Sequence, residues 1–221
     1  VLRDGKTIIR LERKDINEQL IIKNMVGREI EDIFPKRPEF KGGETVLETI
    51  HLNSFDKELN RYIVSDNNIK VHKGEVVGIA GLMGAGRTEL AHSIFGNPKN
   101  YKITGKIVVY NKSVKINSPR DAIKLGIAYV SEDRKKDGLI LQETISQNIT
   151  VADLKKISKF GVLNFFSQNK YAEKYVKDID IRTPSILQQV KNLSGGNQQK
   201  VQVSKWLFSD PKILILDEPT R

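Results

Sequence analysis

The stretch GLMGAGRT, residues 81–88, decides how this sequence folds. It follows an apolar run over residues 76–80, and Leu90 and Ile94 recur after it at helical spacing. A strand, a glycine-rich turn and a helix in this order make a phosphate-binding loop, because glycines let successive backbone N–H groups converge on an anion at the helix N-terminus. The stretch matches G-x-x-x-x-G-K-[ST] everywhere except at Arg87, where the pattern has lysine. Alone, this match also fits a tight strand-to-helix turn without a ligand.

A second apolar run, ILIL at residues 213–216, lies between Pro211 and Pro219. It is too short for a helix, so it predicts a strand that is buried on both faces. This strand would hold Asp217 and Glu218 at its carboxyl end. The same pair also fits an acidic strand ending before a proline turn.

The segment LSGGNQQK, residues 193–200, predicts a second helix start at glycines. Ser194 is placed as the N-cap, and apolar residues recur at i, i+3 and i+4 within residues 201–208. This helix N-terminus is a second place where an anion can bind.

Between these motifs, residues 127–130 predict a buried strand that delivers Glu132 to a loop closing at Gly138. A helix is expected just before this strand, because Ser118 can cap it and Pro119 suits its first position. Residues 144–189 are expected to be mostly helical. Other strands are expected at residues 45–47, 69–71 and 106–110, with a hairpin around Asn111 and Lys112.

The first part of the chain shows no core of its own. Residues 1–10 predict a strand interrupted by a turn, and residues 15–25 predict a helix with Asp15 as its cap. Prolines, glycines and charges then gather over residues 31–43, which is typical of a linker at a domain boundary.

The composition bounds the function only loosely. The 221 residues hold 37 Lys and Arg against 27 Asp and Glu, a formal net charge of +10, and no cysteine. This charge suits an anionic partner such as nucleotide phosphates, nucleic acid or an anionic lipid surface, but the lysines are scattered, which favours a solvated basic surface. The absence of cysteine excludes disulfides and thiolate metal sites. No window reaches the roughly 20 apolar residues that a membrane-spanning helix needs.

Four motifs in this order, over residues 45–221, resemble the nucleotide-binding domain of ATP-binding cassette (ABC) transporters. The spellings GLMGAGRTEL, SEDRK and LSGGNQQK resemble the second cassette of the double-cassette subunits that energise ribose, galactose and xylose importers. The resemblance implies an α/β fold, a P-loop NTPase core of the ABC type, with an antiparallel β subdomain and a helical subdomain at about residues 140–195. It also implies that residues 1–30 are the tail of a preceding cassette with its connecting helix, and that residues 31–44 are a linker.

The resemblance implies ATP and Mg²⁺ as ligands. Glu218 would be the catalytic general base, and Thr88 and Asp217 would be the ligands on the Mg²⁺ side. Phe55 would stack on adenine, with Tyr62 as a rival. The residues around the phosphates would be Gly81, Gly84, Ala85, Gly86, Arg87 and Thr88.

The second glycine turn would act on a different ATP molecule. In this family two cassettes pair head to tail. The motif that begins at Leu193, called the signature, would therefore complete the ATP site of the partner cassette. Glu132 stands where most cassettes have a glutamine that senses the γ-phosphate; it also fits a loop acid paired with Arg134. The signature residues are Leu193, Ser194, Gly195, Gly196, Asn197 and Gln198.

The implied partners are a first cassette in the same longer chain, membrane permease subunits and, indirectly, a periplasmic or extracellular sugar-binding protein. The implied place is the cytoplasmic face of the cell membrane, as a peripheral protein, with no nucleic acid. Two other functions stay open. One is a regulatory cassette that binds nucleotide without hydrolysing it. The other is an ABC ATPase that acts on nucleic acid or ribosomes, which the net charge favours and the lack of basic stripes disfavours.

Two departures from the family pattern carry expectations of their own. Arginine is planar and wider than lysine, so the loop with Arg87 is expected to bind nucleotide but to turn it over poorly. Family members continue beyond the Walker B strand (residues 213–216) to a switch histidine, and the three histidines here all precede that strand. We therefore expect a fragment, incomplete after Walker B and poorly active in isolation.

Overall fold

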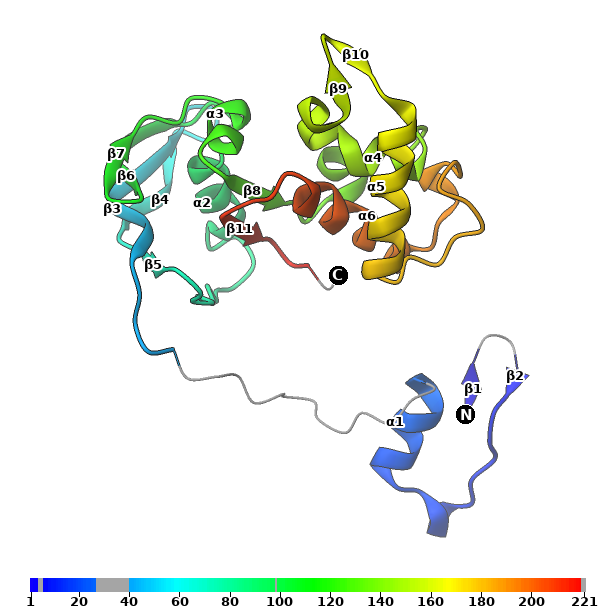
Figure 1. Ribbon diagram of the computed structural model, residues 1–221. Coiled ribbons are helices and arrows are strands. Elements are labelled where there is room, and N and C mark those ends of the chain that lie inside the picture. Colours follow the sequence, from blue (N-terminus) through cyan, green and yellow to red (C-terminus); the bar gives the residue numbers. More distant parts are fainter. Residues whose placement is uncertain (4–5, 27–39, 98, 220–221) are drawn as a thin grey trace. The chain divides into compact units, whose positions relative to one another are not determined.

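The structure, a computed structural model, describes residues 1–3, 6–26, 40–97 and 99–219 (Figure 1). The chain divides into two units, Val1–Lys41 and Gly42–Arg221. Most of the linker expected at residues 31–44 lies outside the described residues, and the division between the units falls after Lys41.

The first unit pairs two short strands and ends in a helix. β1 (Leu2–Arg3) and β2 (Lys6–Thr7) are antiparallel, and a 3₁₀ turn, η1 (Arg13–Asp15), precedes α1 (Glu18–Val26). The expectation that Asp15 caps the helix is wrong. Asp15 belongs to the 3₁₀ turn, and Ile16 is extended, so the helix begins after both residues.

The second unit contains an antiparallel sheet of five strands built around one long strand. β3 (Thr45–Asp56) pairs with β4 (Arg61–Asn67), β5 (Lys70–His72) and β6 (Lys102–Val109), and β6 pairs with β7 (Lys112–Val114). The sequence predicts only the first residues of β3 and misses β4. Thr49 and Ser54 are fully buried on β3, and these polar residues interrupt the apolar alternation by which a strand is recognised.

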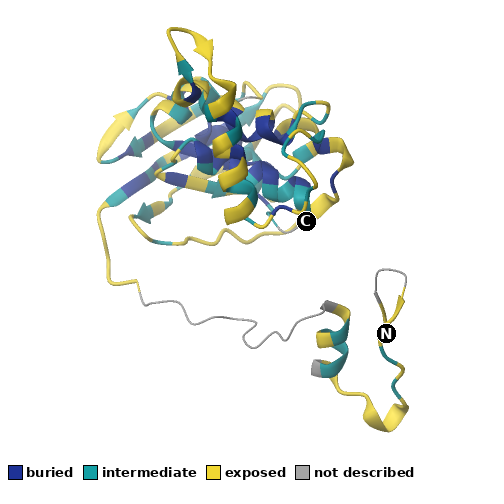
Figure 2. Cartoon of the chain, turned by 45° about the vertical axis from the view of Figure 1, so that its right-hand side comes forward, coloured by how far each residue is buried: buried dark blue, intermediate teal, exposed yellow. Residues whose placement is uncertain are grey.

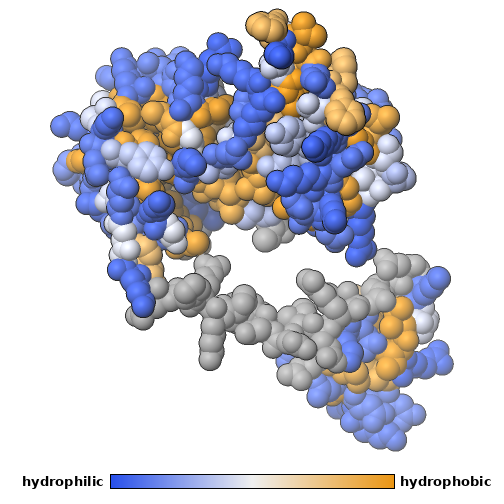
Figure 3. All heavy atoms as spheres, in the orientation of Figure 1, coloured by the Kyte–Doolittle hydropathy of each residue, from blue (hydrophilic) through white to orange (hydrophobic). Residues whose placement is uncertain are grey.

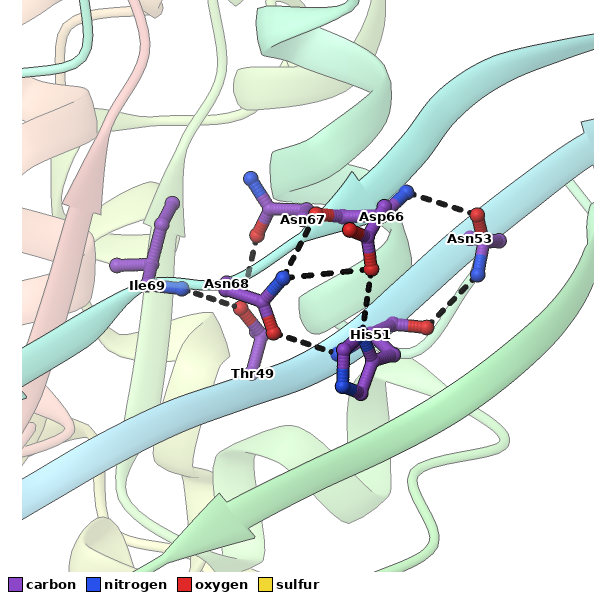
Figure 4. Close-up of polar contacts among 7 residues, drawn as sticks. All are labelled: Thr49, His51, Asn53, Asp66, Asn67, Asn68 and Ile69. Carbon is purple, nitrogen blue, oxygen red and sulfur yellow. Dashed lines mark hydrogen bonds and ion pairs between the residues drawn. The ribbon is translucent and has the colours of Figure 1, made fainter.

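A polar network ties β3 to β4 where their register shifts (Figure 4). The Thr49 hydroxyl donates to Asn67 Oδ1 at 2.8 Å and accepts from the Ile69 backbone N–H at 2.9 Å. His51 Nδ1 lies 2.6 Å from Asp66 Oδ1, and this contact lowers the pKa of Asp66. These side chains satisfy backbone groups that a regular ladder would have paired.

The second unit also contains a sheet of two parallel strands. All four residues of β8 (Ile127–Val130) are buried, as predicted, and β8 pairs with β11 (Ile213–Leu216). α2 (Arg87–Ile94) and α3 (Pro119–Lys124) pack into the same core. The predicted start of α3 is confirmed, because Ser118 Oγ accepts from the Asp121 backbone N–H at 3.3 Å.

Two predictions for apolar runs are wrong: the strand at residues 76–80 and the burial of residues 213–216 on both faces. Residues 76–80 form no strand, and Val76 and Ile79 are 75% and 52% exposed. β11 is a strand, but Leu214 and Leu216 are half exposed. In the described chain, β11 pairs only with β8 and residues 76–80 pair with no strand, so neither run gains the second neighbour that would cover it.

The helical part of the second unit surrounds a core of its own (Figure 2). Its helices are α4 (Ile145–Thr150), α5 (Phe165–Asp178) and α6 (Gly195–Phe208), with short turns η2 (Arg134–Gly138), η3 (Val151–Ile157) and η4 (Val190–Asn192). The expectation of mostly helix over residues 144–189 is only partly right. A hairpin, β9 (Ser158–Lys159) and β10 (Val162–Leu163), interrupts it, and α5 ends at Asp178. Among the described helices, none is long and apolar enough to cross a membrane.

Candidate nucleotide-binding site

The glycine-rich loop is a tight turn against the antiparallel sheet. Gly84 and Gly86 have φ of 79° and 84°, which is left-handed backbone that favours glycine. A Cβ on Gly86 would lie 2.3 Å from the carbonyl oxygen of Ile63 on β4, so only glycine fits there. Gly86 is also the N-cap of α2, and no side chain caps the first turn of this helix. The loop therefore presents its amides at a helix N-terminus, where an anion is stabilised.

Arg87, the first residue of α2, contacts the carboxyl end of β11. Its Nη2 donates to Glu218 Oε1 at 3.2 Å, and both side chains are about one-third exposed. The backbone of Glu218 has φ of 42°, a conformation that costs energy in a residue with a side chain. The fold thus brings together two residues that lie far apart in the sequence and that the motifs single out.

A cavity of about 450 Å³ lies beside this contact. Its charged lining consists of Glu75, Arg87, Asp217 and Glu218. Apolar side chains of β3, β5, β11, α2 and the segment before the loop line most of the rest. None of the lining residues belongs to the signature segment, residues 193–198.

A buried relay of polar side chains supports Asp217. The Tyr129 hydroxyl donates to Asp217 Oδ2 at 3.0 Å, and His92 Nε2 lies 3.3 Å from the same hydroxyl. Burial and then the charge of Asp217 raise the pKa of Tyr129, and burial lowers the pKa of His92. Both groups therefore stay neutral near pH 7, and Asp217 receives a hydrogen bond that orients its carboxylate.

The sequence motifs did not single out Tyr129 or His92. A signal was nevertheless available, because Tyr129 is the one polar residue in the apolar run IAYV. A buried tyrosine hydroxyl usually needs a hydrogen-bond partner, so it indicates a polar neighbour inside the core.

Thr88 and Asp217 offer only oxygen donors, which suit Mg²⁺. Among the described residues, no group of three or more His, Asp or Glu side chains gathers to enclose a metal. This donor set fits an ion that takes its remaining ligands from phosphate and water.

The signature segment begins α6. Ser194 is the N-cap by position, as predicted, but its hydroxyl accepts from Asn197 Nδ2 at 3.0 Å and caps no backbone group. Ser194, Gly195 and Gly196 are exposed, and the first turn of α6 contains no acidic side chain. This turn therefore presents an open and positively polarised surface.

The other signature residues support that turn from inside. Leu193 belongs to the core of the helical part, and Gln198 Nε2 donates to the carbonyls of Val190 and Leu193, each at 3.2 Å. Asn197 Oδ1 accepts from the Arg182 backbone N–H at 2.9 Å. The polar ends of these residues are thus used to hold the segment in place.

The loop that carries Glu132 is fixed to α6 at both of its ends. Gln202 Nε2 donates to the carbonyl and hydroxyl of Ser131, at 3.0 and 2.9 Å, and Lys205 Nζ donates to the Gly138 carbonyl at 2.6 Å. A Cβ on Gly138 would lie 2.4 Å from Gln202 Nε2, so the contact requires glycine. Burial lowers the pKa of Lys205 to about 8. The helix that begins at the signature therefore also holds the loop of Glu132.

The two aromatic candidates for adenine lie together. Phe55 on β3 and Tyr62 on β4 are register partners, with ring centroids 5.2 Å apart in an edge-to-face arrangement. Tyr62 precedes Ile63, whose carbonyl contacts the loop glycine Gly86. The structure thus places the two rings beside each other on neighbouring strands, close in sequence to the carbonyl that adjoins Gly86, and it does not decide which of them would stack on adenine.

The family model described as ABC transporter matches residues 64–221. The chain belongs to the ABC transporter family. A dimeric ATP-binding cassette, solved in a post-hydrolysis state with ADP and phosphate, is similar with a TM-score of 0.65 at 22% identity, covering 79% of this chain and 74% of that one. The predicted fold class is confirmed: this is the ABC ATPase fold, with an antiparallel sheet and a helical part.

The curated relatives of this ABC family chain are longer proteins. A xylose import ATP-binding protein of Thermoanaerobacter pseudethanolicus is 51% identical over 222 residues, covering 100% of this chain and 44% of that protein. An L-arabinose transport ATP-binding protein of Geobacillus stearothermophilus is 47% identical, with 100% and 44% covered. The chain therefore spans less than half the length of these relatives.

Proposed function

We propose that this chain is the ATP-binding half of an ABC importer ATPase that couples ATP binding and hydrolysis to the uptake of a monosaccharide. The contact between Arg87 and Glu218 is the observation that carries the proposal, because it joins the phosphate-binding loop to the acidic end of β11. The relatives support the substrate class, since they are import or transport proteins for xylose and L-arabinose.

The residues of the candidate site have separate roles in this proposal. Backbone amides of residues 84–88 bind the β- and γ-phosphates at the N-terminus of α2. Thr88 and Asp217 bind Mg²⁺, which neutralises phosphate charge when it is bound. Glu218 orients the attacking water and accepts its proton. Phe55 or its neighbour Tyr62 stacks on adenine.

The signature serves a second nucleotide. Its exposed turn, Ser194 to Gly196, lines no part of the cavity at Glu218, which supports a role toward ATP held by another cassette. The relatives are more than twice as long as this chain, which supports a first cassette in the same polypeptide as that partner. The complete protein then docks on permease subunits at the cytoplasmic face of the membrane and receives its sugar through a separate binding protein.

A regulatory cassette is the second candidate, and the same contact favours it. The guanidinium of Arg87 neutralises the carboxylate that would act as general base. While this ion pair persists, the guanidinium occupies the carboxylate that would otherwise orient the attacking water, so the site binds ATP but hydrolyses it slowly. Glu132 in place of a glutamine adds to this, because a carboxylate cannot donate as an amide does.

Titration of the chain with ATP by calorimetry, with and without Mg²⁺, tests nucleotide binding. We expect Mg²⁺ to strengthen ATP binding, and we expect Thr88→Val and Asp217→Asn to remove most of that gain. Thr104→Val is the matched control, because Thr104 is an exposed threonine on β6. A chain that remains folded and binds no ATP at millimolar concentration contradicts the proposal. Turnover in the complete transporter then separates the hydrolysing cassette from the regulatory one.

A further inference from the structure

The hairpin between η3 and α5 carries a patch of apolar side chains that the fold leaves uncovered. We call Phe160, Val162, Phe165 and Phe166 the hairpin patch; they are 95%, 71%, 67% and 81% exposed. The hairpin projects from the helical part, and its surface is exposed and apolar (Figures 2 and 3). Exposed large apolar residues occur singly on most proteins, but a contiguous group on a projecting element marks a contact surface.

The backbone conformation at the tip of the hairpin costs the folded chain free energy. Phe160 and Gly161 form the turn between β9 and β10, with φ of 52° and 80°. A two-residue turn of this kind favours Asn or Asp followed by Gly, and an aromatic residue is strained in left-handed backbone. Phe160 gains almost no burial in return, because it is 95% exposed, and Lys159 Nζ lies 5.8 Å from the centroid of its ring. Folding therefore does not explain why a phenylalanine stands here.

The segment that carries the patch is basic in sequence. Between Asp153 and Glu173 the sequence has four lysines and no acidic residue. Lys156 is used inside the subdomain, where it contacts Asp210 and the Phe208 carbonyl. The other three, Lys155, Lys159 and Lys170, are exposed. An apolar tip with a basic surround is complementary to a surface that is anionic outside and apolar beneath.

We propose that the hairpin patch inserts into the headgroup layer of an anionic lipid bilayer, with Phe160 entering first. A convex tip needs no matching pocket in a bilayer, because lipids move aside, and the lysines then lie among the anionic headgroups. The proposal deepens the membrane location proposed above. It rests on that proposed function only for the identity of the membrane. The lipid contact itself stands on the hairpin.

Co-sedimentation with vesicles tests the lipid contact. The chain is mixed with vesicles of phosphatidylcholine alone, or of phosphatidylcholine with phosphatidylglycerol, at low and high salt. We expect binding only to the anionic vesicles, and weaker binding as salt increases. The variant Lys159→Glu is expected to bind them at least about fivefold more weakly, because it replaces an attractive charge by a repulsive one.

The variant Phe160→Asn separates function from folding. Asparagine is well tolerated in left-handed backbone, so its unfolding temperature should equal or exceed that of the wild type. Its vesicle binding should fall about tenfold, because the aromatic ring no longer enters the bilayer. Phe166→Gln, in the first turn of α5, should also weaken binding. Leu59→Asn is the control, because Leu59 is an exposed apolar residue in the turn between β3 and β4.

Three results overturn the inference: wild-type binding to neither vesicle, equal binding to both, or unchanged binding by Phe160→Asn. The first would leave a protein partner as the reason for the patch. ATP binding is measured on the same samples. A chain that binds ATP but no vesicles contradicts only this inference, and a chain that binds vesicles but no ATP contradicts only the proposed function.

Discussion

Arg87 Nη2 and Glu218 Oε1 are 3.2 Å apart, so the cation that follows the glycine-rich loop pairs with the carboxylate at the end of β11. The partners are separated by most of a domain in sequence, and each belongs to a different motif. The ammonium group of lysine is compact and binds phosphate as a point charge. The guanidinium of arginine is planar and forms directional pairs with carboxylates. Arginine in place of lysine at position 87 therefore changes the surroundings of Glu218 as well as those of the loop.

The first prediction concerns that exchange. Arg87→Lys should raise ATP turnover of the complete transporter by about tenfold or more, because it frees Glu218 to act as general base. Turnover is measured as phosphate release at saturating ATP. Adding Glu218→Gln to the same protein should remove the gain. No gain from Arg87→Lys would mean that this residue does not limit hydrolysis and would leave Glu132 as the main departure to test.

A second prediction compares two glycines of the loop. Gly84→Ala should cost about 1–2 kcal/mol, because only its backbone conformation is unfavourable and open space surrounds it. Gly86→Ala should cost more than about 3 kcal/mol, because it adds a clash with the Ile63 carbonyl to the same strain. Urea unfolding of the chain measures both free energies. Equal losses would show that the loop moves away from β4 without cost.

The sequence predicts best where the signal is local. The start of α3 at Ser118, the buried strand β8 and the helix after the loop depend on neighbours in sequence, and the structure has all three. Motif spacing also selected Arg87 and Glu218, which the fold brings into contact. Nothing in the spacing predicts that these two form an ion pair, because this depends on how β11 is placed against α2.

The errors concern burial that depends on distant strands. Residues 76–80 and β11 have the same apolar composition as β8, yet only β8 is buried on both faces. A strand is covered by what pairs with it and packs on it, and composition does not show whether those neighbours are present. At β3 the sequence instead predicts too short a strand, because the buried polar residues Thr49 and Ser54 interrupt its apolar pattern.

A third prediction concerns the support of Asp217. Tyr129→Phe keeps the ring, whose centroid lies 5.5 Å from that of Phe95, and removes the hydroxyl that donates to the buried carboxylate. It should lower the free energy of unfolding by about 2 kcal/mol, as expected for a lost hydrogen bond to a charged group. Tyr62→Phe is the control, since Tyr62 is 62% exposed, and it should change stability by less than about 0.5 kcal/mol. Equal effects of the two variants would contradict a role of Tyr129 in holding Asp217.

The last prediction uses the buried lysine that fixes the Glu132 loop to α6. Burial lowers the pKa of Lys205 from its ordinary value of 10.5 to about 8. Below pH 8 this lysine is protonated in both the folded and the unfolded chain. Between the two values the unfolded chain keeps a proton that the folded chain has lost, so unfolding takes up a proton and the free energy of unfolding rises with pH.

The rise from this group should total about 3 kcal/mol across the interval. Other groups titrate there as well, so the measured quantity is the difference between the wild type and Lys205→Met in urea unfolding at a series of pH values. This difference should shift in favour of the wild type as pH increases from 7 to 10. A difference that does not change with pH would mean that Lys205 stays protonated in the folded chain, and that its hydrogen bond to Gly138 offsets the cost of burying the charge.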